Sequence, residues 1–447
     1  MRGVNAEAGR SRTLEVAIVL AAVALCTLIA THSVVIGSVA GGWAYPYIAA
    51  ARGRALGAAL LAGGAAALLV AGAMHLSRTR PASAVTLSVL GATGIQLLLW
   101  RIYPFTPGAI VRSDNATSYF TAALRHDPAV LLRDYEPLAR AFPLHAIGNM
   151  PGKILLFRAM HAFTGSPDAM AIAILLLGNL VGVLVFLVAL ELFADRPVAV
   201  AALGLYLFLP SRTVFAPILN GVAPLPVVLA LYLWIRFLRG RGPWLALATG
   251  AALFAAVLFD PTPLGMGLLF AGVALADRLA GRVTTGRVAV GVALAGGALV
   301  AAHLAFRGIT GFDTVRQLAR VAVEAERFNV WARRPYGTWL AANPGEFFLT
   351  LGAPILVVTA WGLRTRQSRS ATATWMAIAG LASVLVVDLL GRNRGEVTRL
   401  WIFLAVPFVL AAAGFLGRER RGALLLSVAM LAVQAGTMLA VLGFVIP

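Results

Sequence analysis

Residues 169–193 read AMAIAILLLGNLVGVLVFLVALELF, an apolar run in which Glu191 is the only charged side chain. The hydrocarbon core of a bilayer is about 30 Å thick, and an α-helix crosses it in about 20 residues. The run is therefore long enough to cross a membrane. Comparable runs recur along the whole chain and predict about thirteen transmembrane helices. They are expected at 14–36, 55–76, 83–103, 169–193, 197–210, 217–235, 243–259, 263–280, 288–306, 346–363, 371–390, 400–416 and 422–445.

The composition of the 447 residues supports the same class: 60% are hydrophobic, 12% are charged, and the mean hydropathy is +0.86. Soluble domains carry about 25% charged residues, so an ordinary soluble domain is excluded. The fold class expected is an all-α polytopic membrane protein. Cys26 is the only cysteine, which rules out a disulfide framework or a thiolate metal cluster within one chain.

The basic residues predict the orientation. Lys and Arg number 37 against 18 Asp and Glu, and such an excess in a membrane chain favours cytoplasmic anchoring and contacts with membrane lipids or phosphate over nucleic acid. With a cytoplasmic N-terminus, every inner segment carries arginine: Arg2, Arg10, Arg12, Arg78, Arg80, Arg196, Arg236, Arg239, Arg241, Arg278, Arg282, Arg287, Arg364, Arg366, Arg369, Arg418, Arg420 and Arg421. The preference for arginine over lysine suggests a GC-rich bacterium, and hence a plasma membrane.

Two long loops, 104–168 and 307–345, then fall on the outer face. Their amphipathic segments, such as 314–334, are too polar to span and predict interfacial helices. A transporter would place ionisable residues near the bilayer midplane and show related halves. Here the unusual polar residues collect on the outer side, and we find no internal repeat. We therefore expect chemistry at the outer face, in a central region 83–416 flanked by two N-terminal spans (1–82) and one C-terminal span (417–447).

The first outer loop contains a candidate proton acceptor and several candidate binding residues. Asp114 follows the third span and precedes a predicted helix at 116–126, where it could take a proton from a hydroxyl at the bilayer surface. The alternative is a helix N-cap formed by Ser113 or Asp114. Lys153, the only lysine, lies in the first turn of a helix that starts at a Pro-Gly pair, an arrangement suited to phosphate. The other candidates are Asp134, Tyr135 and His145, and His145 could bind, transfer protons or pack.

A second polar cluster, DLLGRNRGEVTRLW at 388–401, lies in a short outer turn. Its arginines Arg392, Arg394 and Arg399 could grip phosphate, since guanidinium forks match phosphate oxygens. The alternative is a salt-bridge cluster in which Glu396 pairs with Arg392 or Arg399. Arg212, at the outer end of another span, could face the same cavity.

These residues together resemble the GT-C glycosyltransferases, multi-span enzymes that use polyprenyl-phosphate sugars as donors. The resemblance covers roughly 83–416. In the first loop it rests on Asp114, Asp134-Tyr135, His145 and Met150-Pro151-Gly152-Lys153-Ile154-Leu155-Leu156. In the second half it rests on Arg334-Pro335-Tyr336, Trp339-Leu340, Asn343-Pro344, Phe347-Phe348, Arg394-Gly395-Glu396 and Arg399-Leu400-Trp401. Many relatives have paired acids where this chain has Asp114-Asn115, and Pro-Pro where it has Met150-Pro151.

The resemblance implies transfer of a sugar, with inversion, from a polyprenyl-phosphate donor to the hydroxyl of a glycan, lipid or protein acceptor. Asp114 would be the general base, with Asp388 or Glu396 as alternatives. The binding residues would be Asp134, Tyr135, His145, Lys153, Arg212, Arg392, Arg394, Glu396 and Arg399. No cofactor or metal ligand is assigned, and Asp114-Asn115 weakens the case for a metal held by adjacent carboxylates. The competing interpretations are a flippase or transporter of lipid-linked glycans and a non-catalytic envelope assembly protein.

Overall fold

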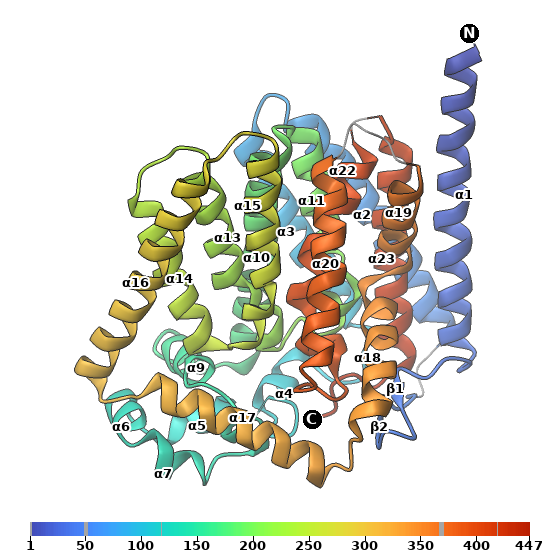
Figure 1. Ribbon diagram of the computed structural model, residues 1–447. Coiled ribbons are helices and arrows are strands. Elements are labelled where there is room, and N and C mark those ends of the chain that lie inside the picture. Colours follow the sequence, from blue (N-terminus) through green and yellow to red (C-terminus); the bar gives the residue numbers. More distant parts are fainter. Residues whose placement is uncertain (1, 49–51, 118, 366–370, 418) are drawn as a thin grey trace.

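The computed structural model describes residues 2–48, 52–117, 119–365, 371–417 and 419–447 (Figure 1). Within these residues, nine helical segments are long and apolar enough to cross a bilayer. They are Ser11–Ala30 in α1 (Arg2–Ala30), Ala55–Leu76 in α2 (Arg52–Leu76), α3 (Pro81–Trp100), α10 (Pro167–Phe193), η1 (Leu219–Gly221) with α13 (Pro224–Leu238), η2 (Thr262–Met266) with α15 (Gly267–Leu279), α16 (Thr285–Thr310), α20 (Ala371–Leu389) and α23 (Arg421–Val441). The all-α, membrane-spanning class is confirmed.

The count of thirteen spans is not confirmed. Three of the thirteen predicted segments are short apolar helices: α11 (Arg196–Leu207), α14 (Trp244–Phe259), and η4 (Ile402–Leu404) with α22 (Ala405–Leu416). A fourth, predicted as one span at 346–363, is two helices, α18 (Tyr336–Leu351) and α19 (Ala353–Arg364), at 100° to each other. The described residues thus contain nine helical segments able to span a membrane, or ten if this bent pair crosses it once.

Gly352 explains the bend between α18 and α19. Its φ of +105° is a backbone conformation that residues with a side chain rarely adopt, and a Cβ here would meet the side chain of Leu431. Pro354 follows in the first turn of α19, where a missing backbone N–H costs no helical hydrogen bond. An apolar run can therefore be long enough to span and still consist of two helices.

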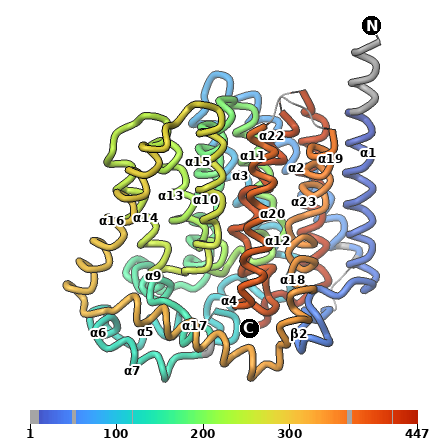
Figure 2. Tube along the Cα trace, viewed as in Figure 1, coloured from blue at the N-terminus to red at the C-terminus, as the bar shows by residue number. Residues whose placement is uncertain are grey.

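Most of the short helices, together with the longer α17 (Thr314–Trp331), lie at one end of the bundle, which we call the loop face (Figure 1). The short helices there are α4 (Pro107–Arg112), α5 (Tyr119–Arg125), α6 (Pro128–Arg133), α7 (Tyr135–Ala139), α8 (Leu144–Ile147), α9 (Gly152–His161) and α21 (Val397–Leu400). The short helix α12 (Pro210–Val214) lies within the bundle instead, beside α10. The opposite end, the arginine face, carries most of the turns predicted to be cytoplasmic; Arg366, Arg369 and Arg418 lie outside the described residues. Helix α1 runs from the arginine face to the loop face, where the C-terminus also lies (Figure 2).

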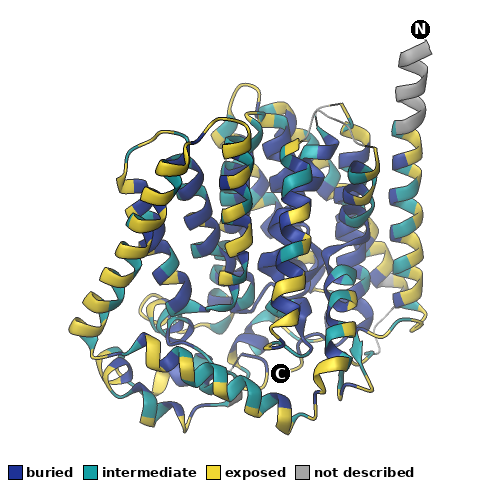
Figure 3. Ribbon diagram, in the orientation of Figure 1, coloured by how far each residue is buried: buried dark blue, intermediate teal, exposed yellow. Residues whose placement is uncertain are grey.

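The two ends of the sequence meet in space. Both α1 and α2 pack against α23, although the sequence assigned them to separate regions at 1–82 and 417–447. The connection between α1 and α2 forms the strands β1 (Gly37–Ser38) and β2 (Trp43–Ala44), which pair antiparallel at the loop face. Burial is greatest in the central helices such as α22, whereas α1 and α16 expose much of their length (Figure 3). The N-terminal segment therefore lies beside the central region and contributes to its loop face.

Helix α17 crosses the loop face, as the predicted amphipathic segment 314–334 suggested (Figure 1). The chain turns out of α16 at Gly311, whose φ is +76°. Asp313 then caps α17, because its Oδ1 accepts the backbone N–H groups of Val315 and Arg316 at 3.1 and 3.0 Å. Gly311 thus ends the span, and the Asp313 cap sets where the helix along the loop face begins.

Candidate functional site

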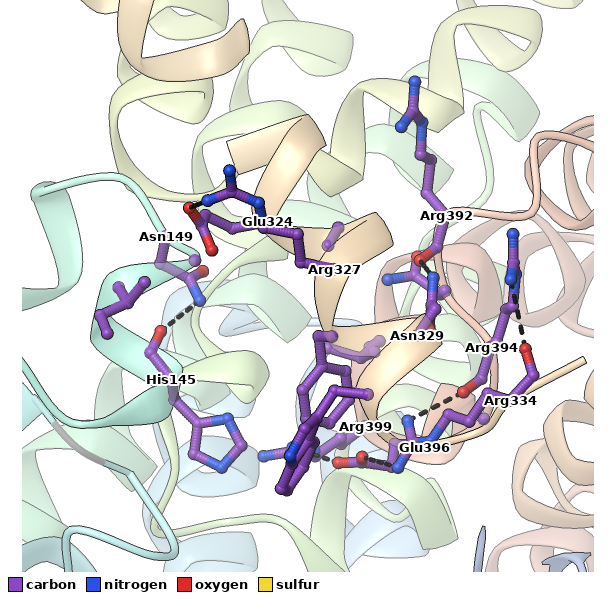
Figure 4. Close-up of a pocket in the computed structure, with 18 residues that line it drawn as sticks. His145, Asn149, Glu324, Arg327, Asn329, Arg334, Arg392, Arg394, Glu396 and Arg399 are labelled. Carbon is purple, nitrogen blue, oxygen red and sulfur yellow. Dashed lines mark hydrogen bonds and ion pairs between the residues drawn. The ribbon is translucent and has the colours of Figure 1, made fainter. Parts of the chain in front are cut away.

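A cavity of about 430 Å³ opens at the loop face between α8, α17 and the turn that follows α20 (Figure 4). Five arginines and two glutamates are among the residues that line it. The lining comprises His145, Ile147, Gly148, Asn149, Glu324, Ala325, Arg327, Phe328, Asn329, Trp331, Arg334, Arg392, Asn393, Arg394, Gly395, Glu396, Arg399 and Leu400. The cavity therefore combines both predicted polar clusters with a face of α17.

Helix α17 connects the two predicted clusters through its polar side chains. The Gln317 amide donates to the backbone carbonyl of Asn149 at 3.0 Å. The Asn329 amide donates to the backbone carbonyl of Arg392 at 3.2 Å, and the Arg392 guanidinium donates to the Ala322 carbonyl at 3.2 Å. One amphipathic helix thus sets the distance between the first loop and the 388–401 turn.

The turn itself is shaped by Asn343 of α18. The Asn343 amide donates to the Asn393 carbonyl at 2.8 Å and to Asp388 Oδ1 at 2.9 Å, and its Oδ1 accepts the backbone N–H of Gly395 at 3.0 Å. Gly395 and Glu396 have positive φ of 84° and 59°. A non-glycine residue in this conformation is strained, and the contacts of the Glu396 carboxylate hold it there.

Glu396 forms the centre of a buried ion triad. Its Oε1 accepts from Arg334 Nη2 at 2.6 Å, and its Oε2 accepts from Arg399 Nη2. Burial alone would raise the pKa of Glu396, but the guanidinium groups of Arg399 and Arg334 outweigh burial and lower the pKa to about 2. The salt-bridge cluster that was the alternative interpretation of this turn is therefore present. Glu396 pairs with Arg399, as that alternative allowed, and also with Arg334, which it did not include.

The remaining arginines of the cavity differ in how far their charge is neutralised. Arg394 donates to both carboxylate oxygens of Glu326, at 3.1 and 3.0 Å. Arg327, whose side chain is 71% exposed, contacts Glu324 at 2.9 Å. Arg392 is exposed and makes no ion pair among the described residues. Arg392 and Arg327 therefore offer the most accessible guanidinium donors to an anion entering the cavity.

His145 stands at the cavity wall in its neutral form. Burial, reinforced by the positive charge of Arg399, lowers the pKa of His145 to about 4. Its Nε2 lies 3.1 Å from the backbone carbonyl oxygen of Asn115, and because a carbonyl only accepts, Nε2 carries the proton. The lone pair is then on Nδ1, which has no hydrogen-bond partner among the described residues.

This burial predicts a pH dependence of stability. The folded-state pKa of His145, about 4, lies below the ordinary histidine value of 6.5, so the unfolded chain binds the proton more readily. The stabilisation is complete above about pH 6.5 and falls as the pH drops toward about 4, with a slope of at most about 1.4 kcal/mol per pH unit. Thermal unfolding of the wild-type protein and of His145→Gln between pH 7 and 4 measures this loss of stability. An equal dependence of stability on pH in both proteins would contradict the lowered pKa of His145.

Lys153 lines a small chamber of about 50 Å³ that adjoins the cavity and shares His145, Asn149, Arg399 and Leu400 with it. The ammonium group is buried, contacts Asp260 Oδ2 at 2.6 Å and donates to Asn149 Oδ1 at 3.2 Å. Burial would lower the pKa of Lys153, but Asp260 outweighs it and raises the pKa. Lys153 is thus a charged residue of the chamber lining whose charge is neutralised by Asp260.

Four predicted site residues line neither the cavity nor the chamber. Asp114 is exposed between α4 and α5, and its Oδ1 accepts from the Thr121 hydroxyl at 2.5 Å. Asp134 is exposed and pairs with Arg133 at 3.2 Å. Buried Tyr135 donates to the Asn149 carbonyl at 3.1 Å. Arg212 is buried within the bundle and donates to the carbonyls of Gly178 and Leu207 and to the Asn179 side chain.

A hollow of about 580 Å³ continues from the cavity along α17. It shares Arg327, Trp331 and Arg392 with the cavity and adds Ala322, Val323, Glu326 and Val330. The side chains of Val323, Val330 and Trp331 are 51%, 69% and 74% exposed. A charged cavity therefore leads into an apolar groove on a helix that lies across the loop face.

Sequence reasoning missed Arg334 as a partner of Glu396 and also missed the face of α17 that lines the cavity. The spacing of Glu324, Arg327, Phe328 and Trp331, three or four residues apart, places them on one helical face and was the available signal. Among the described residues, no group of three or more His, Cys, Asp or Glu could hold a metal ion. No protein-family model and no curated protein sequence matches the chain.

Proposed function

We propose that this protein is an integral-membrane glycosyltransferase of the GT-C type, which transfers a sugar from a polyprenyl phosphate to an acceptor hydroxyl. One observation carries the proposal: the arginine-rich cavity opens into the apolar groove on α17. A polyprenyl-phosphate sugar has the same two parts, an anionic head and an apolar chain. A soluble nucleotide sugar has no apolar chain that could occupy the groove.

The cavity arginines suit the leaving group of this reaction. When the bond between the anomeric carbon and the donor oxygen breaks, negative charge develops on the polyprenyl phosphate. Fixed guanidinium donors stabilise such charge most where they need not reorganise. Arg392 and Arg327 are the accessible donors, while Arg394 and Arg399 are held in place by Glu326 and Glu396.

Asp114 is the proposed proton acceptor. The acceptor hydroxyl oxygen forms the new bond to the anomeric carbon, its proton passes to the carboxylate, and polyprenyl phosphate leaves. Glu396 suits this role less well, because both of its carboxylate oxygens accept from arginines. Asp388 is buried and its carboxylate accepts from the Asn343 amide, so it is poorly placed to meet an acceptor hydroxyl. Asp114 is exposed, and its neighbour Asn115 contacts His145 at the cavity wall.

We place the reaction at the outer face of a bacterial plasma membrane, with the N-terminus in the cytoplasm. The turns of the arginine face, opposite the cavity, support this orientation, since positively charged short loops stay on the cytoplasmic side. Flipped lipid-linked sugars would be the donors at the outer face. The acceptor would be a glycan, a lipid or a protein.

The experiment is transfer or hydrolysis of a panel of labelled polyprenyl-phosphate sugars by the purified protein. With the donor that turns over, Arg327→Gln combined with Arg392→Gln should raise the KM for the donor about 10- to 100-fold, since a hydrogen bond to a charged group contributes about 1.5–3 kcal/mol. Arg125→Gln with Arg316→Gln is the matched control, because both side chains are exposed near the loop face and line neither hollow. Binding of donors without turnover would instead favour a flippase.

A further inference from the structure

A separate hollow of about 580 Å³ opens at the arginine face, the opposite end of the bundle from the proposed active site. Three turns contribute to it: the end of α2, the connection between α10 and α11, and the start of α23. Its lining comprises Met74, His75, Ser77, Arg78, Ala194, Arg196, Pro197 and Arg421. Three arginines distant in sequence therefore surround one space.

The local structure presents these arginines to the hollow. Ser77 and Met74 are buried, and the Ser77 hydroxyl donates to the Met74 carbonyl at 2.9 Å, which fixes the end of α2 beside Arg78. Ala194 has a φ of 50° and turns the chain sharply between α10 and α11, so that Arg196 begins α11. Arg421 is the first residue of α23. The backbone of each turn is thus set by helix ends, while the arginine side chains are exposed.

The lining of this hollow is basic, whereas other arginines on the same face contact carboxylates directly. Glu191 lies within 4 Å of Arg236, Arg239 and Arg241, and Asp277 contacts Arg282 at 2.6 Å. Among the described residues, by contrast, no carboxylate lines the hollow itself, although Asp195 precedes Arg196 and the Glu15 carboxylate lies against Gly422, next to Arg421. The closest acid in sequence, Asp195, accepts the Val198 backbone N–H as the cap of α11.

We propose that this hollow binds a phosphate group, carried either by an anionic phospholipid headgroup or by a soluble phosphate ester. Three guanidinium groups offer forked donors that match phosphate oxygens, and their mutual repulsion is relieved when an anion enters. The hollow lies where the helices of the bundle end, at the level where a headgroup would be found if this face is the cytoplasmic one. The site is independent of the proposed glycosyltransferase activity, because it shares no residue with the cavity at the loop face.

The test uses the full-length protein in phosphatidylcholine nanodiscs, titrated with dioleoylphosphatidylglycerol and read by native mass spectrometry of the released complex. Combining Arg78→Gln, Arg196→Gln and Arg421→Gln should weaken phosphatidylglycerol binding at least about 100-fold. The matched control removes the same charge from the same face at Arg80, Arg278 and Arg364, which do not line the hollow, and should bind within about threefold of wild type.

Inorganic phosphate in competition distinguishes the two sources. Displacement of the lipid by millimolar phosphate in the wild-type protein indicates a site for soluble phosphate esters, whereas retention of the lipid indicates a headgroup site. Equal weakening in the arginine variant and the control would overturn the proposal, because the effect would then be general surface charge. Binding of phosphatidylglycerol by neither the wild-type protein nor its variants, with no phosphate binding either, would also overturn it.

Discussion

Glu396→Gln is expected to lower the free energy of unfolding by about 3–5 kcal/mol, the usual consequence of removing one partner from a buried ion pair. The neutral amide leaves two guanidinium groups, those of Arg334 and Arg399, close together without their shared anion. Both are largely buried, with side-chain exposures of 5% and 15%, so water can compensate little of the loss. Thermal unfolding of the detergent-solubilised protein measures the effect.

Glu326→Gln is the matched control. Glu326 also bridges to an arginine of the cavity, Arg394, but its side chain is 47% exposed, so the loss should stay below about 1 kcal/mol. A similar loss in both variants, or none in Glu396→Gln, would contradict the assignment of a buried triad.

The same triad should make the stability of the fold fall at acidic pH. The folded-state pKa of Glu396, about 2, lies below the ordinary glutamate value of 4.5, so the carboxylate stabilises the fold fully above about pH 4.5. This contribution is lost as the pH falls from about 4.5 toward about 2. The Glu396→Gln variant should lack this acid-induced loss, which separates it from the His145 titration expected at higher pH.

Much of the fold could be predicted because helix length and apolar composition are properties of local sequence. The runs at 169–193 and 371–390 became single spans, α10 and α20, almost at their predicted bounds. The run at 346–363 did not, because the φ of Gly352 and the side chain of Leu431 decide its bend. Leu431 is far along the chain, and a hydropathy pattern contains no information about such a contact.

The candidate site was predicted in part for a similar reason. The sequence analysis singled out His145 and the arginine-rich turn because their polar side chains lie in outer loops, where cytoplasmic anchoring does not explain them. Both do line one cavity. Arg212 carried the same signal, yet it satisfies buried backbone carbonyls inside the bundle. Whether an arginine faces a cavity or neighbouring carbonyls depends on helix packing, which spacing along the chain does not define. Glu326 and Arg334 were missed because their partners lie more than sixty residues away.

Asp114→Asn is expected to lower sugar transfer by about 10²- to 10⁴-fold, the range in which a general base contributes. An amide keeps the size of the carboxylate and can still accept from Thr121, but it cannot take the proton of the acceptor hydroxyl. The donor KM should change little, because the arginines that would hold the phosphate are untouched. Turnover of the donor identified by the panel, at saturating donor and acceptor, provides the measurement.

Glu136→Gln is the matched control, since Glu136 is an acid of the same loop that pairs with exposed Arg316 and lines neither hollow. Retained transfer in Asp114→Asn, together with loss in His145→Gln, would instead move the proton acceptor to His145. That residue is neutral near pH 7 and has its lone pair on Nδ1 at the cavity wall. Glu396 could not take over in the same way, because releasing its carboxylate for a proton would break the triad that maintains the turn.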